Sequence, residues 1–318
     1  MTGGSRSGTP DRRTILGTSG PTDSTGPPAL PSITLSAPPT HRDLPGPLPR
    51  ARPGWGPPYG GGRRERNLGG VSGRKVLVTG ASRGIGRAVA AAFAGQGDRV
   101  AVHHRDSPDL AEQARAALPG EGHVVVQADI ADPEQVRRMV DEAAAALGGI
   151  DVLVNNAGVF LHHPLTEVSY EQWQDAWRRT LAVNLLGAAN AAWCAVRHMP
   201  RGGRIINVSS RGAFRGEPEA PAYGASKAGM NAFGQSLAIA LAPHGIAVGT
   251  VAPGFVETDM TNEHLKAPRG DAIRAQSPFG RVARAEEIAA AVLYLASPEA
   301  EWATGTIIDL NGASHLRT

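Results

Sequence analysis

From residue 74 onward, short apolar runs alternate with alanine-rich segments of helical periodicity, and this alternation constrains the fold more than any other feature. Seven runs of the kind found in buried strands occur at 75–79, 99–103, 123–128, 150–155, 204–209, 246–251 and 306–310. Helical periodicity fills the intervals at 85–96, 108–118, 132–147, 170–199, 222–242 and 285–297. Continuous apolar strands that alternate with helices are typical of a parallel sheet covered on both faces. We therefore expect one α/β domain over residues 74–318, with a doubly wound, seven-stranded parallel sheet.

Residues 1–73 differ from the rest of the chain in composition. They hold 13 of the 25 prolines and 15 of the 40 glycines and show neither helix nor strand periodicity. Too few apolar groups are present to offset the entropy of ordering, so we expect a disordered N-terminal leader. Three interpretations stay open: an unfolded extension, residues upstream of a mis-assigned start near Val71, or a basic tail that contacts an acidic partner.

The charge distribution and the cysteine count exclude several classes of protein. Residues 1–74 hold ten arginines and four acids, whereas the rest of the chain holds 22 basic and 25 acidic groups. This slightly acidic body argues against a nucleic-acid partner. The lone cysteine, Cys194, supplies neither a disulfide nor a metal cluster, and we expect it to be buried. Because no signal peptide or membrane-length apolar run is present, we expect a cytoplasmic protein with no metal and no membrane partner.

A glycine-rich turn, TGASRGIG (79–86), follows the first predicted strand. Gly80 permits a tight turn, Gly84 lets the backbone approach a pyrophosphate, and Gly86 lets the next helix pack on the strand. The N-terminus of that helix offers free N–H groups to phosphate oxygens. Such a glycine triplet can also be only a tight turn, but its place after the first strand favours a dinucleotide site.

The end of the second predicted strand indicates which dinucleotide binds. NAD-selective sites carry an acid about 20 residues past the glycines, where this chain has His104 and Arg105. A guanidinium suits a 2′-phosphate, and Arg83 can close on the same group, so we expect NADP(H). Two alternatives stay open: both arginines are solvated surface charges, or Asp106 binds the ribose of NAD(H).

Tyr223 and Lys227 lie four residues apart, on one face of a predicted helix. A free phenol titrates near ~10, and a neighbouring ammonium lowers that pKa, as a general acid at neutral pH requires. Ser210 ends the fifth predicted strand, at the sheet edge where α/β folds bind ligands. It can therefore give a substrate oxygen a second hydrogen bond. The Tyr-x-x-x-Lys pattern alone is common by chance, so its position carries the argument.

In their order and spacing, these motifs resemble the short-chain dehydrogenase/reductase family from residue 74 to the C-terminus. Further matches are NNAG (155–158), Asn184, Pro253-Gly254 and Thr258. The phrases VAPGFVETDM (251–260) and FGRVARAEEIAAAVLYLAS (279–297) resemble the 3-oxoacyl-(acyl-carrier-protein) reductase-like subgroup. The resemblance implies a Rossmann fold and an NADP(H)-dependent oxidoreductase that interconverts a ketone or aldehyde and an alcohol. It also implies a small-molecule carbonyl substrate, acyl-carrier-bound substrates included.

The resemblance implies four catalytic residues. Tyr223 would donate the proton to the carbonyl oxygen, and Ser210 would hold and polarise that oxygen. Lys227 would bind the nicotinamide ribose and lower the pKa of Tyr223. Asn184 would fix a water that links Lys227 to solvent.

It also implies a cofactor-binding set, in which Asp129 would bind the adenine, Asn156 would steady the sheet and Thr258 would hold the carboxamide. The expected set is Gly80, Ser82, Arg83, Gly84, Ile85, Gly86, Arg105, Asp129, Ile130, Asn156, Ala157, Gly158, Tyr223, Lys227, Pro253, Gly254, Val256 and Thr258. The family resemblance further implies a homotetramer or homodimer, with subunit contacts through the helices at 170–199 and 222–242.

The chain departs from the family pattern at Ala213, where a glycine is usual, and at 311–313 (NGA), where paired glycines are frequent. These departures bear on the substrate and the assembly, not on the reaction class. We expect residues 255–282 to form a lid over the substrate. His162 and His163 are either a solvated loop or part of the site. An NAD-dependent dehydrogenase and a non-catalytic nucleotide-sensing protein of the same fold remain as alternatives, although Ser210, Tyr223 and Lys227 argue against the second.

Overall fold

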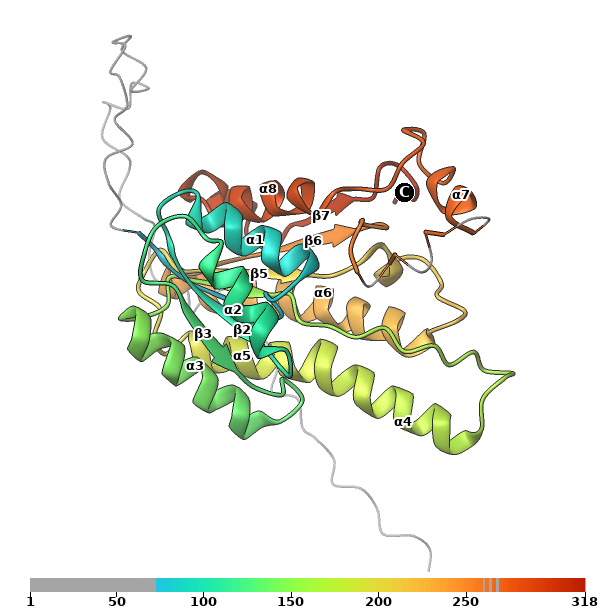
Figure 1. Ribbon diagram of the computed structural model, residues 1–318, viewed down its shortest axis with the longest axis horizontal. Coiled ribbons are helices and arrows are strands. Elements are labelled where there is room, and N and C mark those ends of the chain that lie inside the picture. Colours follow the sequence, from blue (N-terminus) through green and yellow to red (C-terminus); the bar gives the residue numbers. More distant parts are fainter. Residues whose placement is uncertain (1–72, 260, 263–264, 267–268, 318) are drawn as a thin grey trace, which may run out of the picture. The chain divides into compact units, whose positions relative to one another are not determined.

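One parallel sheet runs through the part of the chain that the computed structural model describes, residues 73–259, 261–262, 265–266 and 269–317. Apart from Gly73, the predicted leader lies outside the described residues. The sheet order is β3-β2-β1-β4-β5-β6-β7, which confirms the predicted doubly wound, seven-stranded fold (Figure 1). The strands are β1 (Lys75–Val78), β2 (Arg99–His104), β3 (Val124–Gln127), β4 (Val152–Asn155), β5 (Arg204–Val208), β6 (Ala247–Pro253) and β7 (Ile307–Leu310).

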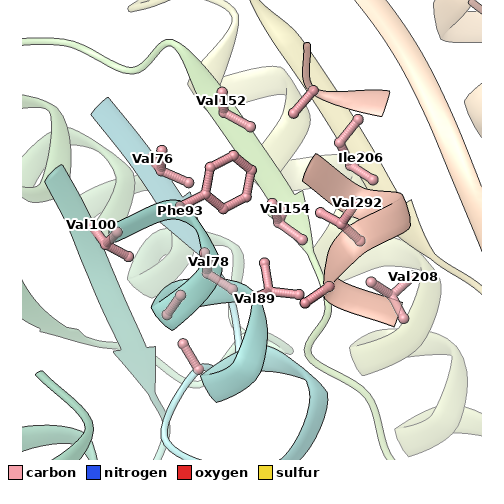
Figure 2. Close-up of a cluster of buried hydrophobic side chains, with 14 of the residues drawn as sticks. Val76, Val78, Val89, Phe93, Val100, Val152, Val154, Ile206, Val208 and Val292 are labelled. Carbon is pink, nitrogen blue, oxygen red and sulfur yellow. The ribbon is translucent and has the colours of Figure 1, made fainter. Parts of the chain in front are cut away.

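Alternate strand residues face two separate hydrophobic layers. Val76 and Val78 point into one layer with Phe93 at its centre, whereas Leu77 points into the other (Figure 2). The first layer is covered by α1 (Gly84–Ala94), α2 (Pro108–Ala116) and α8 (Ala285–Leu295). Because the inner strands are buried on both faces, they carry consecutive Val, Ile, Leu and Ala residues in place of an alternating pattern.

The second layer is covered by α3 (Pro133–Leu147), α5 (Ala188–Ala195) and α6 (Pro221–Leu241). In Figure 1, α3 and α5 lie on the side of the sheet opposite α1 and α8. The predicted helix at 170–199 is interrupted: α4 (Tyr170–Leu181) passes into α5 through a π-helical turn, η1 (Ala182–Gly187). A β-carbon at Gly187 would lie 2.5 Å from the carbonyl oxygen of Ile130, so the chain can pass this close only without a side chain.

Short elements complete the described residues. They are α7 (Arg269–Arg274) and the 3-10 turns η2 (Arg211–Ala213), η3 (Ala242–His244) and η4 (Pro298–Ala303). Among the described helices, none has the length and apolar character needed to cross a membrane. The expected burial of Cys194 is confirmed. Trp173 and Trp177 pack against each other with ring centroids 5.7 Å apart.

Candidate active site

A pocket of about 300 Å³ opens at the carboxyl ends of the strands, where the sheet order reverses between β1 and β4. Open α/β sheets bind ligands at this position. Ser210 lines the pocket, together with most of the predicted cofactor residues: Gly80, Ser82, Arg83, Gly84, Ile85, Arg105, Asp129, Ile130, Asn156, Ala157, Gly158, Tyr223, Lys227, Pro253, Gly254, Val256 and Thr258. Gly86 and Asn184 are the predicted site residues that do not line it.

The turn between β1 and α1 requires glycine at each of its three glycine positions. Gly80 and Gly84 have φ values of +64° and +55°, which L-residues with side chains rarely adopt. A β-carbon at Gly86 would lie 2.3 Å from the Gly80 carbonyl oxygen and 2.5 Å from Asn156 Nδ2. Gly86 therefore acts from beneath the pocket, by letting α1 approach the turn closely.

The N-terminus of α1 lacks a side chain that caps its free N–H groups. Arg83 occupies the N-cap position with an extended backbone, makes no side-chain capping bond, and no acid lies in the first turn. The N–H groups at this end therefore keep their hydrogen-bonding capacity, and they border the pocket through Gly84 and Ile85. This open helix end fits a phosphate group, so the described residues suit the dinucleotide that the motif predicts.

His103 is a pocket residue that the sequence analysis missed. Its Nδ1 lies 2.9 Å from the Gly80 amide nitrogen, which can only donate, so Nδ1 is the acceptor. Nε2 consequently carries the hydrogen and donates to the Ala128 carbonyl oxygen at 3.1 Å. Burial lowers the pKa of His103 to about 4, so the ring is neutral at physiological pH. This histidine thus ties the turn after β1 to the segment after β3. A buried-strand position taken by a histidine, directly after the apolar residues of β2, was the available signal.

Arg105 already has a partner in the structure. Its guanidinium donates from Nη2 to Asp106 Oδ2 at 2.6 Å and from Nε to the same oxygen at 3.0 Å. This pairing lowers the pKa of Asp106, and the nearby charge of Arg83 acts in the same direction. Arg83, Arg105 and Asp106 therefore form one small charged group at the edge of the pocket.

Asn156 ties the end of β4 to the turn after β1. Its Nδ2 donates to the carbonyl oxygens of Thr79 and Gly80 at 2.9 and 3.1 Å, and its own N–H donates to Thr79 Oγ1 at 2.9 Å. On the neighbouring side, Asp129 lines the pocket while its Oδ1 accepts from the Ala131 N–H. These contacts hold the pocket floor in a fixed shape.

Tyr223, Ser210 and Lys227 meet on one side of the pocket. Tyr223 and Lys227 project from the first turns of α6, and Lys227 Nζ lies 5.8 Å from the centre of the Tyr223 ring. Phe160 packs edge-on against the phenol ring, with centroids 5.1 Å apart. Ser210 follows β5, and its Oγ accepts from the Gly212 N–H at 3.0 Å. The three side chains that the motifs single out are thus brought together.

The two titratable groups of this cluster are both shifted by burial. Burial raises the pKa of the Tyr223 phenol above its ordinary value, and hydrogen bonding with Ser210 offsets only part of this. Burial lowers the pKa of Lys227 to about 8. The expected lowering of the Tyr223 pKa by Lys227 is therefore not found here, because burial of the phenol outweighs other influences. Tyr223 therefore keeps its proton at neutral pH.

Asn184 lies in the π-helical turn and is fully buried. Its Oδ1 accepts from the Val159 N–H at 2.8 Å, and its Nδ2 donates to the Val159 carbonyl at 3.0 Å and to Ser226 Oγ at 3.1 Å. A β-carbon at Gly158 would lie 3.4 Å from Asn184 Oδ1 and 3.6 Å from Lys227 Nζ. Asn184 therefore lies behind the pocket wall, and both Asn184 and Lys227 approach Gly158.

Of the two neighbouring histidines, His163 is buried, with Nε2 accepting from the Ala222 N–H at 3.2 Å. This bond anchors the start of α6 next to Tyr223. Next to the departure at Ala213, a β-carbon at Gly212 would lie 2.7 Å from Glu217 Oε1. Among the described residues, no group of His, Cys, Asp or Glu side chains is arranged to hold a metal ion.

Comparison with known proteins places the chain in a family. A family model described as enoyl-(acyl carrier protein) reductase matches residues 80–315. The 3-oxoacyl-[acyl-carrier-protein] reductase FabG of Staphylococcus aureus is 37% identical over 247 residues, which cover 76% of this chain and 98% of the relative.

Two solved structures resemble the described domain closely. A short-chain dehydrogenase from Burkholderia cenocepacia in complex with NADP is 36% identical with a TM-score of 0.70, covering 76% of this chain and 98% of that one. A blue fluorescent protein from a metagenomic library in complex with NADPH is 34% identical with a TM-score of 0.69, covering 77% and 99%. The chain thus belongs to the short-chain dehydrogenase/reductase family and, within it, is similar to the 3-oxoacyl-(acyl-carrier-protein) reductases.

Proposed function

We propose that the chain is an NADP(H)-dependent oxidoreductase that interconverts a ketone or aldehyde and an alcohol, with 3-oxoacyl thioesters among its candidate substrates. The observation that carries the proposal is the grouping of Ser210, Tyr223 and Lys227 beside the open N-terminus of α1 in one pocket. The S. aureus relative is named a 3-oxoacyl-[acyl-carrier-protein] reductase, which supports the substrate class.

NADP(H) is the proposed cofactor because cations, not an acid alone, stand where the 2′-substituent of the adenosine ribose would lie. Arg105 and Arg83 both line the pocket, and the B. cenocepacia structure was solved with NADP. Asp106 accompanies Arg105, so a 2′-phosphate would share the guanidinium with this carboxylate. When bound, the nicotinamide ring would supply the hydride that reduces the carbonyl carbon.

The residues of the chain supply the proton and the alignment. Tyr223, protonated at neutral pH, donates its phenolic proton to the carbonyl oxygen as negative charge develops there. The Ser210 hydroxyl donates a second hydrogen bond to the same oxygen and so polarises the carbonyl. In the reverse direction, the phenolate accepts the proton of the alcohol.

Lys227 and Asn184 are proposed to restore the proton. Lys227 Nζ donates to the Val208 carbonyl oxygen at 2.8 Å, which leaves two of its three N–H groups for a ribose and a water. Asn184 Oδ1 has a second lone pair next to Gly158, on the side that Lys227 also faces. A water held between these groups connects the buried ammonium to solvent.

The proposal extends to assembly and organisation. Leu186 on η1, Trp193 on α5 and Ile239 on α6 are 57%, 59% and 80% exposed, which supports subunit contacts through these elements in a homotetramer or homodimer. The family match begins at residue 80, which supports a domain boundary near residue 74. We further propose that the protein acts in the cytoplasm, with the leader as a separate segment.

Replacing Tyr223 with Phe removes the proton donor and leaves the ring in place. We expect NADPH consumption with a panel of ketones, aldehydes and a 3-oxoacyl thioester to fall at least ~100-fold, since general acid catalysis contributes this much. NADPH affinity, measured by fluorescence titration, should stay nearly unchanged. Tyr170→Phe, at an exposed tyrosine on α4, is the matched control. Turnover that persists in Tyr223→Phe would remove this residue from its role.

Replacing Arg105 with Ala tests the cofactor. We expect NADPH affinity to fall roughly tenfold to a hundredfold, the range for a lost charge-assisted hydrogen bond, while NADH affinity changes little. Arg87→Ala, at an exposed arginine on α1 that does not line the pocket, is the control. Equal losses for NADPH and NADH would contradict the 2′-phosphate assignment.

A further inference from the structure

A second pocket of about 240 Å³ lies beside the active-site pocket. Consecutive residues line the two pockets. Ser210 lines the active-site pocket and Arg211 lines the second; likewise, Gly254 lines the active-site pocket and Phe255 the second. Its walls are mostly apolar and include Phe255, Ile273, Phe279, Val282 and Leu310. The volume is somewhat below the ~300–1,000 Å³ of sites for drug-sized ligands, so a ligand here must be small.

A buried cation faces this apolar pocket. Arg211 is 5% exposed, and its guanidinium carbon lies 5.3 Å from the centre of the Phe255 ring. Nη1 donates to Gln276 Oε1 at 2.9 Å and to Ser314 Oγ at 2.6 Å. Within the described part of the chain, Nε and Nη2 have no acceptor, so three N–H groups remain for a ligand.

The other charges around the pocket are neutralised, whereas Arg211 is not. Arg281 pairs with Glu287 at 2.7 Å, and Asp309 pairs with Arg317 at 2.7 Å. Among the described residues, no carboxylate lies within ion-pair distance of Arg211.

Two further groups act on Arg211 at longer range. The charge of Glu217 is felt there but forms no ion pair, and a second cation, Arg215, donates to the same Gln276 oxygen at 3.1 Å. A charge removed from water without a counter-ion is costly, so this arrangement favours an anion.

We propose that this pocket binds the carboxylate of a small apolar organic acid. The planar fork of Arg211 matches the two oxygens of a carboxylate, and the aromatic and aliphatic walls take the apolar body of the acid. The acid is either a free ligand or the acid end of an oxo-acid substrate that extends from Ser210. Binding does not require the redox reaction proposed above, so a direct binding assay tests this site separately.

Calorimetric titration of the full chain with hexanoate and with uncharged hexanamide tests the site. We expect hexanoate to bind and hexanamide to bind at least roughly tenfold more weakly, since a hydrogen bond to a charged group is worth about that much. Arg211→Gln should abolish the preference for the acid. Arg211→Lys should keep part of it, because charge remains while the fork is lost.

Arg137→Gln is the control, because Arg137 is an exposed arginine on α3 that does not line this pocket. It should bind hexanoate as the unchanged chain does. Thermal unfolding of each variant shows whether it is folded. If Arg211→Gln does not fold, Arg211→Lys provides the test. Equal binding of acid and amide, or an unchanged preference in the folded Arg211 variants, would overturn the proposal.

A kinetic comparison then distinguishes the two sources of the acid. For an oxo-acid substrate, Arg211→Gln raises the KM of the acid roughly tenfold or more and leaves that of its methyl ester unchanged. For a free ligand, both KM values stay the same while hexanoate binding is lost.

Discussion

The helices α1 and α3 both begin at the carboxyl edge of the sheet, yet only α3 is closed by its own side chains. Asp132 caps α3 by accepting from the N–H groups of Glu134 and Gln135 at 2.9 and 3.1 Å. At α1 the corresponding residue is Arg83, which makes no such bond, and Gly84 follows it. The chain therefore completes its hydrogen bonds where it needs only stability and leaves donors unused where we propose that a phosphate binds.

The difference also has a cost in local stability. An N-cap side chain is worth ~1 kcal/mol, and acids in the first turn add to this. At α1 the chain forgoes both contributions and places a cation at a helix end that favours anions. A ligand phosphate would satisfy the helix end and the arginine together. A cap introduced at α1 should therefore raise stability and lower cofactor affinity, and a cap removed from α3 should lower stability alone.

Arg83→Asp gives α1 the cap that α3 has, and it should produce the largest effect. The new carboxylate would occupy the free N–H groups and repel a phosphate, so NADPH affinity should fall roughly a hundredfold. Thermal stability should rise by ~1 kcal/mol in the same variant. Arg83→Asn caps without charge and should weaken NADPH less. Fluorescence titration and urea unfolding measure the two quantities, and a variant that binds NADPH normally would contradict the role of the open helix end.

His103 makes the turn before α1 sensitive to acid. Its folded-state pKa is about 4 because of burial, whereas a free histidine titrates at 6.5. Between these values the unfolded chain takes up a proton that the folded chain does not, so stability present above pH 6.5 is lost as the pH falls toward 4. The full loss is up to ~3 kcal/mol.

Urea unfolding at a series of pH values measures this loss, and His103→Asn should flatten its pH dependence in that window. The control is His162→Asn, in the exposed loop beside the site. An identical pH profile in His103→Asn and the unchanged chain would show that other groups dominate.

Asp132→Ala opens α3 and should produce the smallest effect. We expect a loss of ~1 kcal/mol of unfolding free energy, because two N–H groups lose their acceptor. NADPH affinity should stay within about twofold of the original value, because Asp132 contributes only to stability. Ser169→Ala, at the capped start of α4, provides a parallel case. A marked loss of cofactor affinity in Asp132→Ala, but not in Ser169→Ala, would contradict the inference that the cap of α3 serves stability only.

The fold followed from apolar periodicity because parallel strands buried on both faces leave a strong signal. All seven strands lie where the sequence predicts them, and the residues of the glycine turn, Ser210, Tyr223 and Lys227 converge as expected. At these positions the residue type indicates a function, and the predicted strand ends place the residues at the same edge of the sheet. Contacts between distant segments were harder to foresee.

Three features needed the tertiary structure. The π-helical turn at 182–187 lies inside a longer segment of helical periodicity, and there Gly187 approaches Ile130 closely. The bond from His103 to Gly80 joins residues 23 positions apart. The direction of the Tyr223 pKa shift depends on burial, which a residue spacing does not reveal.

The π-helical turn between α4 and α5 makes the two directions of a length change unequal. Such a turn holds one residue more than an ordinary helical turn, so removing one residue from 182–187 would allow a regular helix. The residues of α4 and α5 on either side would keep the faces that they now present, because the deletion removes only the residue that the wider turn absorbs. A substitution at Asn184 perturbs one side chain, whereas this deletion would remove the wider turn that carries it.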